Sequence, residues 1–97
     1  MPKRTRDYHG WLRGQLTNPV AAANYINAAI EDSPEMLLVA VRNVAEAQKM
    51  AKVADRAGVN RETLYRTLSE DGNPTLDTLS SVLEALGLEI VVKVQQR

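Results

Sequence analysis

The 97-residue chain contains no cysteine and only one histidine, His9. The absence of cysteine excludes a disulfide scaffold and a thiolate metal site, and a single histidine excludes any site built on two imidazoles. No apolar run approaches the roughly 20 residues that a membrane-spanning helix needs. The basic residues near the start lead into polar residues and not into the apolar core of an export signal. We therefore expect a cytoplasmic protein without a bound metal or other cofactor.

The sequence also lacks the residue sets that carry common enzyme chemistry. It has no glycine-rich phosphate loop and no serine, histidine and aspartate set that would assemble a nucleophile with its base. The sequence predicts that the protein is not an enzyme. A chain of this length forms one domain, because single cores usually form at about 100–150 residues.

Charge of one sign is not in excess either, since 12 Lys and Arg balance 12 Asp and Glu. The zero total argues against a strongly basic nucleic-acid binder. The charges are nevertheless segregated along the chain: residues 1–13 carry +3, residues 14–48 carry −3, residues 49–66 carry +3 and residues 67–89 carry −5. The basic stretch at 49–66 therefore needs an explanation that the total does not supply.

Helix signals recur between residues 18 and 87. Asn18-Pro19 and Ser33-Pro34 each combine a capping side chain with a proline that fits the first helical position, and Asn60 and Thr75 are further capping residues. Apolar residues at helical spacing follow each signal, with Val20 and Leu76 placed on the apolar faces of their helices. The predicted helices span about 19–31, 34–48, 51–57, 61–70 and 76–86, and a shorter helix is expected at about 8–16.

The last residues change period from helical to alternating. Leu88, Ile90, Val92 and Val94 alternate with a more polar set, which predicts a β-strand. No second strand-like run exists in the chain, so we expect this strand to pair antiparallel with its copy across a two-fold axis. Pairing with the chain's own N-terminal segment is the alternative. The predicted organisation is a basic N-terminal arm at 1–17, a helical domain at 18–87, and a dimerisation strand and tail at 88–97.

Residues 53–66 fit a helix-turn-helix. Ala54 is small enough for two helices to cross closely, and Gly58 permits the positive φ of a sharp turn. Val59 fills the corner, Asn60 caps the second helix, and Leu64 anchors that helix to the core. The simpler alternative is a helical hairpin in an all-α bundle with solvated charges.

In a DNA-binding helix-turn-helix the second helix lies in the major groove. The residues that we expect to contact base edges are Arg61, Glu62, Thr63, Tyr65 and Arg66. The residues that we expect to contact phosphates are Lys49, Lys52, Arg56 and Asn60. Arginine suits the O6 and N7 atoms of guanine, whereas phosphate contacts give register and affinity without sequence information. This arrangement explains the basic stretch.

From Leu16 to Val94, about four fifths of the chain, the sequence resembles the Xre-type addiction module antidote proteins, HigA-like antitoxins of type II toxin–antitoxin systems. The matching segments are residues 25–31, 53–54, 58–59, 61–69, 72–76, 78–79, 82–83 and 86–88. The run Arg-Glu-Thr-Leu-Tyr at 61–65, followed by Gly-Asn-Pro-Thr at 72–75, is the most distinctive part.

The resemblance implies a five-helix, lambda-repressor-like domain in a homodimer that neutralises a RelE/ParE-like toxin, binds operator DNA and represses its own operon. Two positions depart from the family: Lys49 stands where glycine is common, and Met50 stands where many relatives in the wider class have a phosphate-binding glutamine. We expect Lys49 to supply that phosphate contact. A stand-alone transcriptional regulator without a toxin, and a protein-interaction module that no longer binds DNA, are the alternatives.

The N-terminal block holds the candidate toxin contacts Tyr8, Trp11 and Arg13. Tryptophan and arginine are favoured at the energetic centres of protein interfaces. There are two alternatives for this block. Trp11 packs onto the domain's own surface, or the block is a basic arm that reaches DNA.

Overall fold

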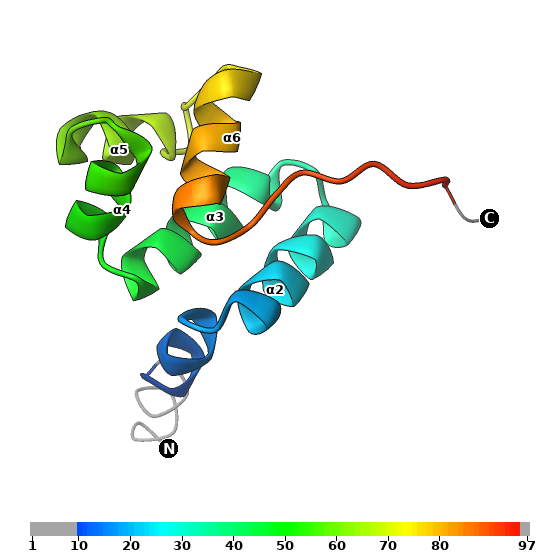
Figure 1. The fold of residues 1–97 in the computed structure, drawn as a ribbon. Helices are drawn as coiled ribbons and strands as arrows, with labels where there is room; N and C mark the ends of the chain where they lie inside the picture. Colours follow the sequence, from blue (N-terminus) through cyan, green and yellow to red (C-terminus); the bar gives the residue numbers. More distant parts are fainter. Residues whose placement is uncertain (1–9, 96–97) are drawn as a thin grey trace.

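The structure, a computed structural model, describes residues 10–95 and is mostly helical, as the sequence predicts. Within that range a helical segment at 10–16 precedes five further helices. These are α2 (Pro19–Asp32), α3 (Met36–Ala47), α4 (Met50–Ala57), α5 (Arg61–Thr67) and α6 (Leu76–Ala85) (Figure 1). No helix in the described part of the chain is both long enough and apolar enough to cross a membrane.

Three of the predicted capping residues begin their helices as expected. The side-chain oxygen of Asn18 accepts hydrogen bonds from the backbone N–H groups of Val20 and Ala21, at 2.8 and 3.3 Å. Asn60 and Thr75 likewise cap α5 and α6. Each cap satisfies N–H groups that have no partner inside the first helical turn, so the helix starts are fixed by the sequence.

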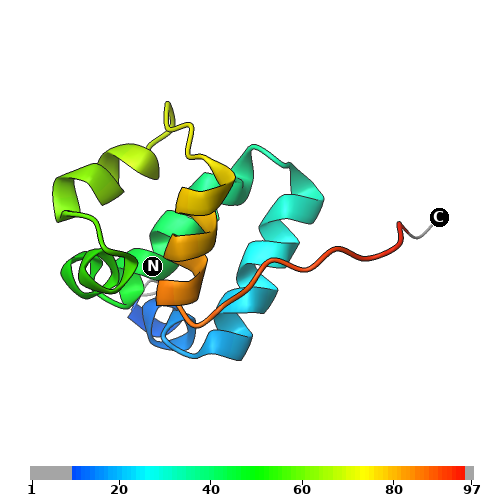
Figure 2. The same cartoon turned by 45° about the horizontal axis from the view of Figure 1, so that its top comes forward.

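The core lies where the helices cross. α2 packs against α3, and α4 packs against α3, α5 and α6. Two views show α6 lying across α3, with α4 and α5 on one side and α2 on the other (Figures 1 and 2). The largest fully buried side chains come from four of the five helices and the turns that follow them: Val41, Val44, Val53, Leu64, Leu68, Val82 and Leu86. Leu16, from the first helical segment, belongs to the same core.

The apolar faces of α2 and α6 differ from the prediction at one end of each helix. α2 turns Ala22 and Ile26 inward, and Val20, two residues from Ala22 and therefore on another side of the helix, is exposed. Leu76, the first residue of α6, is also exposed. The buried residues of this helix, Val82, Leu83 and Ala85, lie near its C-terminal end.

The start of α3 differs as well. The Ser33 hydroxyl donates a hydrogen bond to the Glu35 carboxylate and does not cap the helix. α3 therefore begins at Met36, two residues later than the Ser33-Pro34 signal predicts.

Residues 88–95 continue from α6 as chain without helix or strand. Gly87 has φ of 85°, as expected for the glycine that ends α6, and the N–H of Leu88 donates to the carbonyl of Leu83 at 2.8 Å. In both views the end of the chain then runs away from the helical body (Figures 1 and 2). The predicted strand is therefore not formed within the described part of a single chain, where no ladder partner exists for it.

Candidate nucleic-acid interface

The turn between α4 and α5 has the geometry that the sequence predicts. Gly58 adopts φ of 76°, and its N–H donates to the carbonyl of Asp55 at 3.2 Å. The N–H of Val59 then donates to the carbonyl of Ala54 at 3.0 Å, while the Ala54 side chain is buried. A side chain at Gly58 would strain this left-handed conformation, so glycine sets the angle at which α5 leaves α4.

Asn60 fixes the first turn of α5. Its Oδ1 accepts a hydrogen bond from the N–H of Thr63 at 2.7 Å, and its carbonyl accepts the N–H of Leu64 at 3.0 Å. Asn60 is an exposed residue, and its side-chain oxygen is engaged in the cap. The amide nitrogen of the same side chain is the donor that could make the predicted phosphate contact.

α5 divides its side chains between core and solvent. Leu64 is buried against the core, and Thr63 is half-buried beside it. Four of the five predicted base-contacting residues are exposed and fall into two pairs four residues apart: Arg61 with Tyr65, and Glu62 with Arg66. Residues at this spacing lie on the same side of a helix. The structure therefore gathers these four on the outer face of α5 and leaves Thr63 at its edge.

The predicted phosphate contacts are less uniform. Lys49 and Lys52 are exposed at the start of α4. Arg56, also exposed, donates from Nη1 to the carbonyl of Ala85 at 3.4 Å, at the C-terminal end of α6. A helix C-terminus is partly negative and attracts a cation, so Arg56 links α4 to α6 as well as facing solvent.

Lys49 has an unusual backbone. Its φ of 78° is positive, and it is the one non-glycine residue in the described range with a positive φ. This is the position at which the resemblance described above leads us to expect glycine. The link between α3 and α4 thus keeps a glycine-type conformation with a lysine in it.

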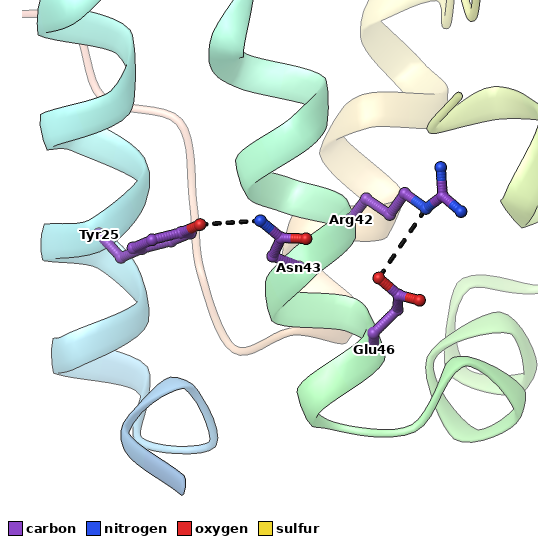
Figure 3. A network of polar contacts seen from close by, with 4 residues as sticks. All are labelled: Tyr25, Arg42, Asn43 and Glu46. Atoms are coloured by element: carbon purple, nitrogen blue, oxygen red, sulfur yellow. Dashed lines mark hydrogen bonds and ion pairs between the residues drawn. The ribbon is translucent and has the colours of Figure 1, made fainter. Parts of the chain in front are cut away.

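Arg42 of α3 is a residue that sequence analysis missed. Its guanidinium carbon lies 5.7 Å from the centre of the Tyr65 ring, and its Nε lies 3.9 Å from Oε1 of Glu46. Figure 3 shows the neighbouring Asn43 pointing the other way, where its Nδ2 donates to the Tyr25 hydroxyl at 2.8 Å. Arg42 belongs to a net negative stretch of the sequence, so only its approach to Tyr65 in the folded chain reveals this cation.

The remaining candidates lie away from α5. Tyr8 is outside the described residues, whereas Trp11 and Arg13 are exposed on the first helical segment, with 59 % of Trp11 accessible. In the tail, Leu88 is half-buried and packs against the core, and the other three residues of the predicted dimer strand, Ile90, Val92 and Val94, are exposed.

A shallow depression of about 140 Å³ lies between the end of α4 and the start of α6, and its lining residues are Ala57, Val59, Asp77, Thr78, Ser81 and Val82. Within residues 10–95 no group of three or more His, Cys, Asp or Glu side chains is placed to hold a metal ion.

The fold defines a small helical protein in which α4, a short turn and α5 are compatible with a helix-turn-helix. Comparison with known proteins gives the family: the model described as "Probable addiction module antidote protein" matches residues 12–94, and the chain belongs to this family. It is 39 % identical over 94 residues to an uncharacterized protein of Haemophilus influenzae, with 96 % of this chain and 95 % of that protein aligned. No solved structure matches the chain significantly.

Proposed function

We propose that the protein is the antidote of a type II toxin–antitoxin pair, of the Xre-type, HigA-like class, and that it also binds operator DNA as a homodimer to repress its own operon. Membership of the antidote family supports a toxin partner. The proposed toxin is a RelE/ParE-like protein. Because operator DNA lies in the bacterial cytoplasm, the proposal places the protein there.

The observation that carries the DNA-binding part is the outer face of α5. Arg61, Tyr65 and Arg66 are exposed on a helix whose first turn is fixed by Asn60 and whose inner face is anchored by Leu64. An exposed, rigidly held helix bearing two arginines suits a major groove, where arginine bonds guanine and Glu62 accepts from cytosine N4. In this proposal Thr63 contacts bases from the edge of the same face.

The phosphate contacts in this proposal come from Lys49, Lys52, Arg56 and Asn60. Lys49, Lys52 and Arg56 are exposed cations at the start of α4 and within it, and Asn60 is the N-cap of α5. Phosphate contacts release counterions, so binding should weaken steeply as salt is raised. In a symmetric dimer the two copies of α5 would meet half-sites separated by about 34–36 Å, one turn of DNA.

The proposed toxin contact is the N-terminal block with Tyr8, Trp11 and Arg13. The exposed indole of Trp11 supports this assignment, because large aromatic side chains beside arginine favour protein interfaces. A Trp11→Ala variant should neutralise the toxin less well and still bind operator DNA.

Co-expression tests the antidote function. The reading frame adjacent to the gene is expressed from an inducible promoter, alone or together with this protein, and growth is followed. We expect arrest by the neighbour alone and normal growth with both. The antidote proposal is wrong if the neighbour leaves growth unchanged, and a stand-alone regulator then becomes the better account of any DNA binding.

A further inference from the structure

The segment that follows α6 exposes its apolar side chains. The accessible fractions are 46 % for Ile90, 72 % for Val91, 91 % for Val92 and 88 % for Val94. Exposed β-branched residues in a segment that belongs to no sheet are the usual template for strand addition. The start of the segment is fixed, because the Leu88 N–H is bonded to Leu83 and the Leu88 side chain packs against the core.

The segment has two chemically different faces when it is extended. Side chains alternate between the faces of a strand, so Leu88, Ile90, Val92 and Val94 share one face. The other face carries Glu89 and Lys93, two residues to either side of Val91. Leu88 begins the apolar face and packs against the core, so we call this face the inner face and the opposite one the outer face. In the single chain Ile90, Val92 and Val94 of the inner face are exposed.

We infer that two copies pair these segments antiparallel with the two-fold axis at Val91, an inference that rests on the homodimer in the proposed function. In this register Glu89 of each copy lies opposite the partner's Lys93, which gives two ion pairs on the outer face. The two Val91 side chains meet at the axis between them. The pairs on the inner face are wholly apolar: Leu88 with the partner's Val94, and Ile90 with the partner's Val92.

Neighbouring registers lack this complementarity. Sliding one strand past the other by one residue moves the axis by half a residue. The apolar face of each strand then lies on the same side as the charged face of its partner, so apolar side chains are exposed and charged side chains are buried. Moving the axis by one residue, to Ile90 or to Val92, keeps the faces but takes Lys93 away from Glu89. Opposite charges directly across a ladder are favourable and like charges are unfavourable, so the register at Val91 is preferred.

Single cysteines test the register, because the chain has no thiol of its own. Directly opposite residues have Cα atoms about 4.5–5.5 Å apart, within disulfide reach, whereas diagonal neighbours are about 7–8 Å apart, beyond the limit of about 7 Å. Val91→Cys should therefore form a covalent dimer under oxidised glutathione. The matched control Val92→Cys, at a more exposed position, should remain largely reduced because each cysteine faces the partner's Ile90.

Charge exchange gives a second readout by sedimentation. Glu89→Lys and Lys93→Glu should each weaken the homodimer roughly tenfold, since each places two like-charge pairs across the ladder. A mixture of the two variants should form heterodimers as stable as the wild type. Glu84→Lys, which makes the same charge change on α6, should leave the dimer unchanged.

Efficient cross-linking of Val91→Cys together with heterodimer recovery supports the register. A wild-type dimer in which Val92→Cys cross-links as fast as Val91→Cys, or in which the mixture recovers nothing, overturns the register and leaves the homodimer intact. A wild-type chain that stays monomeric at all concentrations overturns both the register and the proposed homodimer.

Discussion

The guanidinium of Arg42 lies over the ring of Tyr65, with 5.7 Å between the guanidinium carbon and the ring centre. This contact joins α3 to the exposed face of α5. Arg42 also lies 3.9 Å from the Glu46 carboxylate, one helical turn along α3. The aromatic side chain on the candidate DNA-binding face is therefore in contact with a cation from a different helix.

Loss of that cation should weaken DNA binding. Arg42→Ala removes a contact worth about 0.5–1 kcal/mol at exposed sites, and the affinity for operator DNA, measured by fluorescence anisotropy, should fall by a few-fold. Glu46→Gln is the control, because it removes the carboxylate and leaves the cation over Tyr65. Equal affinities for Arg42→Ala and the wild type would show that the orientation of Tyr65 does not matter for DNA.

Glycine at position 49 should stabilise the fold. Lys49 has φ of 78°, a conformation that costs a residue with a Cβ atom about 1–3 kcal/mol. Lys49→Gly should therefore raise the free energy of unfolding by about 1 kcal/mol in urea titrations. Lys49→Ala keeps the Cβ atom and should give no such gain, although both variants lose the charge and should bind DNA more weakly. Equal stabilities of the two variants would contradict the strain.

The loop between α5 and α6 requires glycine at position 72 for space. A Cβ atom at Gly72 would lie 2.0 Å from the carbonyl oxygen of Thr67 and 2.9 Å from that of Ser69. Gly72→Ala should destabilise the protein by about 1–3 kcal/mol, because backbone must move. Gly14→Ala is the matched control: its Cβ would meet nothing within 4 Å, and thermal unfolding should show unchanged or slightly higher stability. Equal melting temperatures for both variants would contradict the close approach.

The two roles of Asn60, capping α5 and contacting DNA phosphate, should be separable by substitution. Asn60→Ala removes the bond to the Thr63 N–H and should cost about 1 kcal/mol of stability. Asn60→Ser retains a capping oxygen and should recover most of that stability, but it lacks the amide nitrogen proposed to bind phosphate. Stability is measured by thermal unfolding and affinity by anisotropy. If Asn60→Ser binds DNA as tightly as the wild type, Asn60 acts only as a cap.

Features that depend on neighbouring residues were predictable from the sequence. Asn18, Asn60 and Thr75 satisfy N–H groups two or three residues away, and Gly58 and Gly87 permit backbone angles at their own positions. Each of these signals is complete within one helical turn. The helix starts at 19, 61 and 76 and the turn between α4 and α5 therefore follow from local chemistry.

Features that depend on packing were not predictable. Val20 and Leu76 fit the apolar period, yet each lies where no neighbouring helix covers it. Arg42 and Tyr65 are 23 residues apart and approach each other only in the folded chain, which spacing along the sequence does not encode. The tail has the pattern of a strand, and a second chain is needed before that pattern can form a ladder.

Binding to the DNA upstream of the gene tests the central claim, that the outer face of α5 recognises an operator. Fluorescence anisotropy at fixed salt should show that Arg61→Ala and Arg66→Ala each lose about 1–3 kcal/mol of binding free energy and discriminate less between operator and unrelated DNA. Arg13→Ala, an exposed arginine remote from α5 in the chain, should bind as the wild type does. Wild-type affinity in both α5 variants would contradict the assignment of α5 as the recognition helix.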